Sequence, residues 1–88
     1  MLGGLLKPNW QHKLPEKRLH AISKLGAEAA DQKILAKLAL NDSEQVVQIE
    51  AISKLNDFST LLQIFELSSD EVVRKNAKQQ LILSLIHI

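Results

Sequence analysis

Apolar residues recur along the middle of the chain at the spacing of one helix face. Within residues 31–55, a first stripe repeats at positions i, i+1, i+4 and i+5 and consists of Ile34, Leu35, Leu38 and Ala39. After a polar break at 41–43, a second stripe has the same helical period and consists of Val47, Ala51 and Leu55. Ile49 and Ile52 lie on another side of this second segment, so most of its circumference is apolar. We therefore predict two helices joined by a turn, the second of which lies between neighbours.

The same pattern returns 26 residues later. Residues 31–55 align without a gap on residues 57–81, and the identical pairs include Asp31/Asp57, Leu35/Leu61, Val46/Val72, Val47/Val73, Ala51/Ala77 and Leu55/Leu81. Residues 21–25 recur as residues 51–55, at an offset of 30. A short helical hairpin cannot bury its apolar face alone, and stacked copies solve this problem. The pattern predicts an all-α fold, a right-handed α-solenoid of about five helices, with a half unit at 15–26 and full units at 31–55 and 57–81.

Turn and capping residues predict where these helices begin and end. Pro15 suits the first turn of a helix that runs to residue 25, and Gly26 suits its C-terminal stop. Asp42 or Ser43 is placed to cap the second helix of the first full unit. Residues 56–57 supply a stop and a new cap, and residues 68–70 begin the last helix with Ser69 as a capping residue.

The last predicted helix also matches a known repeat pattern. The matching residues are Asp70, Val73, Arg74, Ala77 and Leu81. This arrangement resembles the second helix of a HEAT-type, armadillo-like repeat, and the resemblance covers roughly residues 16–82. The first full unit departs from the pattern at Gln48, where the family has arginine. The resemblance implies that Arg74 reaches an acidic group at a turn between repeats, either Asp42 or Asp70.

Two further resemblances concern the ends of the sequence. The opening, residues 1–19, is similar to the start of large bacterial proteins of unassigned function in which HEAT-like repeats precede coiled-coil regions. The last six residues, 83–88, resemble one translated frame of a transposon end used in sequencing libraries, and a natural apolar helix end is the alternative. We therefore expect a fragment whose repeats occupy 15–82, with a non-native tail at 83–88 and a native frame that is cut near Ile82.

Composition and charge narrow the function classes. The chain has no cysteine, which excludes disulfides, thiolate metal sites and cysteine nucleophiles. No apolar run reaches the ~18 residues of a membrane span, and the start lacks a secretory leader, so we expect a cytoplasmic protein. The charge is uneven, because residues 1–26 carry five basic residues against Glu16 alone, whereas residues 27–88 are net acidic.

Basic residues supply the candidate partner-binding positions. In the N-terminal part these are Lys13, Lys17 and Arg18, and in the last helix Lys75 and Lys78. Trp10, in the basic lead-in at 1–14, is expected to cover the end of the helical stack, with base stacking as the alternative. Asp42, Asp70 and Arg74 are expected to have structural roles.

No catalytic or metal-binding constellation is present in the sequence. The three histidines, His12, His20 and His87, have no ligand spacing, and we find no phosphate loop or nucleophile turn. We therefore expect no enzyme activity, cofactor or small-molecule substrate. The leading hypothesis is a protein-interaction scaffold, the N-terminal arm of a larger protein. The alternative is binding of nucleic-acid phosphates through the basic N-terminal quarter.

Overall fold

The computed structural model describes residues 8–86, and the expectations for residues 1–7 and 87–88, His87 included, lie outside it. A short 3₁₀ helix, η2 (Asn9–Gln11), precedes five α-helices. These are α1 (Pro15–Ile22), α2 (Ala29–Asn41), α3 (Gln45–Lys54), α4 (Phe58–Leu67) and α5 (Glu71–Ile86). No strand occurs between residues 8 and 86, so the all-helical prediction is confirmed.

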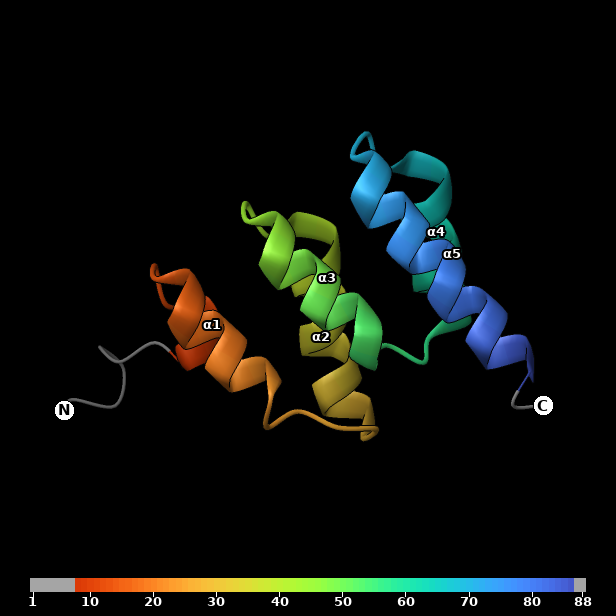
Figure 1. Cartoon of the computed structure of the whole chain (residues 1–88). Coiled ribbons are helices and arrows are strands. Elements are labelled where there is room, and N and C mark those ends of the chain that lie inside the picture. Colours follow the sequence, from red (N-terminus) through yellow and green to blue (C-terminus); the bar gives the residue numbers. More distant parts are fainter. Residues whose placement is uncertain (1–7, 87–88) are drawn as a thin grey trace, which may run out of the picture.

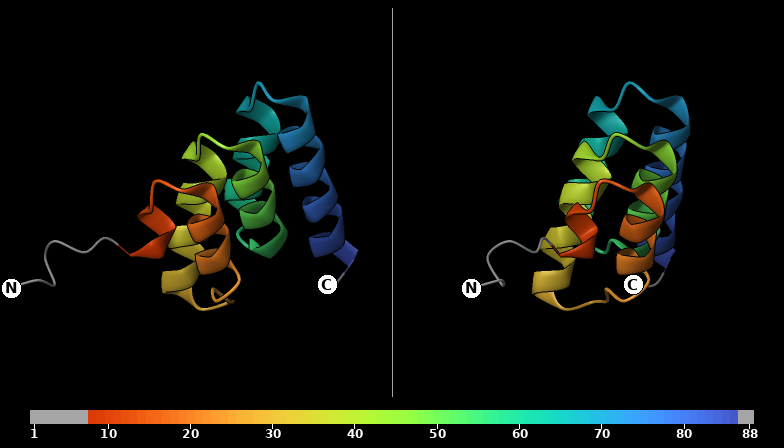
Figure 2. Two further views of the ribbon diagram at one scale, coloured as in Figure 1. Left: turned by 60° about the vertical axis from the view of Figure 1, so that its left-hand side comes forward. Right: turned by 90° about the vertical axis from the view of Figure 1, so that its left-hand side faces the viewer.

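The helices form two layers. Helices α1, α3 and α5 lie side by side in one layer, and α3 contacts both of its neighbours (Figure 1). Helices α2 and α4 lie in the second layer, each packed against the helix that follows it in the chain (Figure 2). The result is an elongated molecule with extents of 46 × 27 × 17 Å. Hairpin α2–α3 contains most of the predicted unit 31–55, and hairpin α4–α5 most of the unit 57–81.

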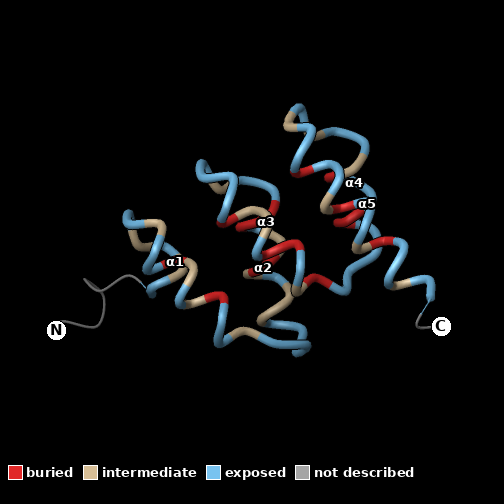
Figure 3. Tube along the Cα trace, in the orientation of Figure 1, coloured by how far each residue is buried: buried red, intermediate tan, exposed pale blue. Residues whose placement is uncertain are grey.

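The predicted apolar stripes form the core between the two layers. Val47 and Val73 are 0% and 1% exposed, and Ala51 and Ala77 are fully buried. Buried residues follow the facing sides of the helices, while the outer sides are exposed (Figure 3). The two small alanines let neighbouring helices approach closely, because a longer side chain at these positions would meet the packed core.

The three helices of the first layer share one register. They begin at residues 15, 45 and 71, which are separated by the offsets of 30 and 26 found in the sequence. The position of Ile22 in α1 is Ile52 in α3, and both side chains are 1% exposed. The same position in α5 is Lys78, which is exposed. This position is therefore apolar in α1 and α3, which have a helix after them in the layer, and charged in α5.

Helix α1 ends earlier than predicted. It stops at Ile22 rather than residue 25, and the chain continues in tight turns in which the N–H groups of Lys24 and Leu25 donate to carbonyls three residues earlier. Gly26 does not have the positive φ of a glycine stop, and its N–H donates instead to Asp31 Oδ2 at 2.9 Å. The predicted role of Gly26 as the helix stop is wrong.

In the turns before α3 and α5, carboxylates accept backbone N–H groups, and so does Ser68, whose Oγ accepts the Asp70 N–H at 3.2 Å. Asp70 Oδ1 accepts the N–H groups of Val72 and Val73 at 2.9 and 3.2 Å, which makes it the cap of α5. Asp42 Oδ1 accepts the N–H of Glu44 at 2.9 Å, in the turn just before α3. Ser43 and Ser69 make no side-chain hydrogen bond with another described residue, so their predicted capping role is wrong.

Candidate functional site

The buried ion pair between Arg18 and Asp42 joins the first helix to the next hairpin. Arg18 Nε and Nη2 donate to the two Asp42 carboxylate oxygens at 2.8 and 3.0 Å. Nη1 donates to the His12 carbonyl at 2.7 Å. The two side chains are only 11% and 3% exposed. Arg18 is therefore committed to the fold, and the expectation that it faces a partner is corrected.

Arg74 does not reach an acidic residue in the described structure. Its Nε donates to the Phe65 carbonyl at 3.3 Å, and its guanidinium carbon lies 5.9 Å from the centre of the Phe65 ring. Asp42 is bound by Arg18 instead, and the Asp70 carboxylate receives the side-chain amide of Gln45 at 3.1 and 2.9 Å. The implied pairing of Arg74 with Asp42 or Asp70 is wrong, because these two carboxylates have other partners.

One register position makes an equivalent bond in all three helices of the first layer. Arg18, Gln48 and Arg74 are separated by the same offsets of 30 and 26 residues. Each donates to a main-chain carbonyl of the segment before its own helix, namely His12, Ala39 and Phe65. Ala39 and Phe65 are themselves equivalent residues. The sequence repeat is thus matched by a repeated side chain–backbone bond.

A second register position links successive helices of that layer. Lys54 Nζ donates to the Ile22 and Leu25 carbonyls at 2.9 and 2.8 Å, at the end of α1. Gln80, 26 residues later, donates to the Ser53 and Leu55 carbonyls at 3.1 and 3.3 Å, at the end of α3. Free carbonyls at a helix C-terminus need such donors. Each of these two helix ends is therefore capped by the next helix of the layer.

Trp10 lies just before the first α-helix. Its side chain is partly buried against the core, within the short helix η2. The Lys37 ammonium of α2 lies 5.7 Å from the centre of the indole, within reach of a cation–π interaction. Trp10 therefore contacts the neighbouring hairpin, and its ring is not a fully open stacking surface.

The remaining candidate lysines lie in two separate places. Lys13 and Lys17 are exposed just before and on α1; His20 on α1 and Lys24 just after it are also exposed. Lys75 and Lys78 are exposed on α5. Helix α3 lies between α1 and α5, so the structure does not combine the four lysines into one basic site (Figure 1).

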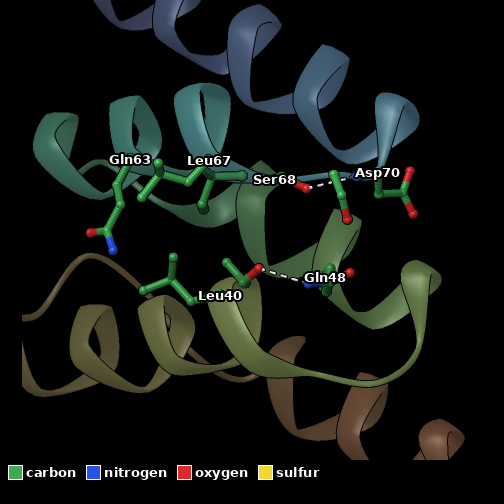
Figure 4. Close-up of a pocket in the computed structure, with 9 residues that line it drawn as sticks. Leu40, Gln48, Gln63, Leu67, Ser68 and Asp70 are labelled. Carbon is green, nitrogen blue, oxygen red and sulfur yellow. Dashed lines mark hydrogen bonds between the residues drawn. The ribbon is translucent and has the colours of Figure 1, made fainter.

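A groove that the sequence did not predict lies between the two hairpins. It has a volume of about 320 Å³, and it is lined by Ala39, Leu40, Gln48, Gln63, Ile64, Leu67, Ser68, Ser69 and Asp70. Leu40 and Leu67 project toward it from α2 and α4 (Figure 4). They are 37% and 75% exposed, whereas Ala39 and Ile64 are almost fully buried. One feature of the sequence could have predicted this groove: Leu40 and Leu67 each come just before a turn and lie outside the apolar stripe of their helix.

Polar groups border this groove. Gln48 donates its side-chain amide to the Ala39 carbonyl at 3.1 Å, while the Gln63 amide makes no hydrogen bond with another described residue. The only charged residue of the lining is Asp70. The Gln45 side-chain amide and the Val73 N–H lower the pKa of Asp70 below its usual value. Asp70 is therefore negatively charged at neutral pH.

A more open hollow of about 830 Å³ lies beside the end of α5 and includes Phe58, Leu83 and Leu85. Helix α5 continues without a break through residues 83–86, the first part of the segment that resembles a library end.

The described residues show no other feature that assigns a chemistry. Between residues 8 and 86, no group of three histidine or acidic side chains is placed to hold a metal ion. No helix in this part of the chain has the length and apolarity needed to cross a membrane. Comparison of the chain with family models, with curated proteins and with solved structures finds no match.

Proposed function

We propose that the chain is a HEAT-like α-solenoid segment that acts as a protein-interaction scaffold within a larger cytoplasmic protein. The repeat assignment is supported by the two sets of equivalent bonds, from position 18/48/74 and from position 54/80, which recur with the sequence offsets. Recurrence of both the packing residues and the polar links is what stacked copies of one unit require.

The observation that carries a binding role is the exposed pair Leu40 and Leu67. Apolar side chains that flank a groove are costly to leave in water, and a contiguous exposed apolar surface is typical of interaction sites. Leu40 lies in the last turn of α2 and Leu67 is the last residue of α4, so both side chains belong to helices. We therefore place the interaction surface between the hairpins rather than on the lysines of α1 or α5.

The experiment is peptide display with the 88-residue chain as bait. A random peptide library is selected against the wild-type chain, and the enriched peptides are tested for binding to L40S/L67S and K75E/K78E variants. We expect the selection to enrich peptides, and we expect these peptides to lose binding to at least one of the two variants. The variant must keep the wild-type circular dichroism spectrum, which shows that it is folded. A bait that enriches no peptide above an empty support contradicts the scaffold proposal.

Nucleic-acid binding is the second candidate, and the exposure of Lys13 and Lys17 favours it. Arg18 no longer counts among the candidate phosphate-binding residues, because its guanidinium is bound to Asp42. Phosphate binding would release counterions, so affinity for a labelled oligonucleotide should fall steeply between about 50 and 200 mM salt. It should also fall in a K13E/K17E variant. Binding that is undetectable at low salt, or independent of salt, eliminates this candidate.

A further inference from the structure

We propose that the groove between the hairpins binds an extended peptide segment that carries an apolar side chain next to a lysine or arginine. The apolar side chain would lie between Leu40 and Leu67, and the basic residue beside Asp70. This inference rests on the proposed scaffold function and names the surface and the chemistry of the partner.

The apolar requirement follows from the two leucines. Leu67 is 75% exposed, the largest exposed fraction among the large apolar residues of the described chain. The other two apolar residues of the lining, Ala39 and Ile64, are buried, so Leu40 and Leu67 supply the exposed apolar surface of the groove. One inserted aliphatic side chain would therefore remove apolar surface of both leucines, as well as its own, from water.

The basic requirement follows from the charge around the groove. The two segments that contain the turns beside the groove, 40–46 and 66–72, contain no lysine or arginine; of their residues, Leu40, Leu67, Ser68, Ser69 and Asp70 line it. The two segments carry five acidic residues, Asp42, Glu44, Glu66, Asp70 and Glu71. Only Asp42 is neutralised by an ion pair, with Arg18. A basic segment is attracted to these turns, whereas an acidic segment or a second copy of the same turns is repelled.

The extended conformation follows from the volume of the groove and its side-chain amides. A volume of about 320 Å³ is at the lower end of ligand sites, which suits one narrow segment rather than a whole helix. The Gln63 amide has no partner among residues 8–86, and Gln48 uses only a donor, so its oxygen can still accept. An extended peptide presents a free N–H and C=O at each residue, and these groups can pair with both glutamines.

The test uses the full 88-residue chain and a fluorescein-labelled nine-residue peptide in a glycine–serine background. The peptide contains one leucine beside two lysines, and both orders are made. Two control peptides replace the leucine by serine or the lysines by glutamate. The protein variants are Leu40→Ser, Leu67→Ser and the matched control Leu62→Ser, because Leu62 is as exposed as Leu40, at 37%, and does not line the groove. Affinity is read from fluorescence anisotropy, and the site from ¹H–¹⁵N chemical shifts.

We expect the leucine–lysine peptide to shift the amides of residues 39–40, 48 and 63–70. Affinity should fall at least about tenfold in the Leu67→Ser and Leu40→Ser variants, since each loses most of one leucine contact. Affinity should change less than about twofold in Leu62→Ser. Both control peptides should bind at least about tenfold more weakly.

The groove assignment is overturned by equal affinity for Leu67→Ser and Leu62→Ser, by stronger binding of the glutamate peptide, or by no shifted amide with any peptide. Shifts confined to α1 or α5 also overturn it but leave the scaffold proposal intact, because a peptide would then bind elsewhere on the chain. The scaffold proposal itself is decided by whether the display experiment enriches any peptide above an empty support, wherever on the chain that peptide binds.

Discussion

At the scale of single residues, side chains at equivalent positions make the same kind of hydrogen bond to the backbone, but we expect them to contribute very different amounts to the free energy of unfolding. Arg18 and Arg74 both donate to a carbonyl before their own helix. Arg18 also binds Asp42 through two hydrogen bonds and is buried, whereas Arg74 is exposed. Removing one partner of a buried ion pair leaves an uncompensated charge, while exposed arginines contribute little.

These two arginines therefore form a matched pair for a stability measurement. We expect Arg18→Ala to lower the free energy of unfolding by about 3 kcal/mol, because Asp42 is left buried without a counterion. Arg74→Ala should cost less than about 1 kcal/mol. Urea unfolding followed by circular dichroism at 222 nm measures both. Similar losses for the two variants would show that the ion pair contributes no more than the shared carbonyl bond.

Asp70 gives a prediction for pH. Its pKa is lowered in the folded chain, first by the Gln45 amide and then by the Val73 N–H, so the unfolded chain binds the proton more readily. The contribution of Asp70 to the free energy of unfolding is thus complete above its unfolded pKa of about 4, and is lost as the pH falls through the lower folded pKa.

Gln45→Ala should reduce this contribution and move the pKa of Asp70 back toward its usual value. We expect the difference in unfolding free energy between wild type and Gln45→Ala to be present at neutral pH and to shrink as the pH falls below about 4. Urea unfolding at several pH values, with an NMR titration of the Asp70 carboxyl, tests it. A difference that stays constant with pH would mean that Gln45 does not act through Asp70.

At the scale of helices, the ends of α1 and α3 depend on the helix that follows each of them in the layer. The side chains of Lys54 and Gln80 supply donors to the final carbonyls of α1 and α3. The last four carbonyls of an α-helix have no partner within the helix, and α1 has only 8 residues. Stability at these ends is therefore shared between elements.

Lys54→Met tests this dependence because methionine keeps the apolar stem and removes the donor. We expect a loss of about 1.5 kcal/mol in unfolding free energy, the typical cost of losing hydrogen bonds from a charged group. Lys24→Met is the matched control, since Lys24 has the equivalent position and its exposed side chain makes no hydrogen bond with another described residue; the substitution should change stability by less than about 0.5 kcal/mol. Equal effects in urea unfolding would exclude the cap as the cause.

The helices were predictable from the sequence, but most of the hydrogen bonds and the ion pair that link them were not. The stripes that contain Val47 and Val73 depend only on helical period, which is a local property of the chain. The Arg18–Asp42 pair joins residues 24 positions apart, so it exists only once the hairpin has docked on α1. The groove escaped prediction for the same reason, because Leu40 and Leu67 face each other only after the two hairpins pack.

At the scale of the whole molecule, the exposed face of α5 differs from the matching faces of α1 and α3. Leu19 and Ile22 in α1, and Ile49 and Ile52 in α3, are buried or partly buried beside the next helix of the layer. The same register in α5 has Lys75 and Lys78, both exposed. Two ammonium groups on this face oppose its burial against another apolar helix, because a charge buried without a partner is costly.

Replacing Lys75 and Lys78 by isoleucine, the residue at the equivalent positions of α3, should therefore turn this face of α5 into an association surface. We expect a Lys75→Ile/Lys78→Ile chain to have a larger mass than the wild-type chain at the same concentration, since its α5 would present the side chains with which α3 packs on α5. A Lys24→Ile/Lys33→Ile chain adds the same apolar groups outside that register and is the control. Light scattering after gel filtration measures both masses. If the control chain associates as strongly, the effect comes from hydrophobicity alone; if neither does, the lysines are not what limits stacking at α5.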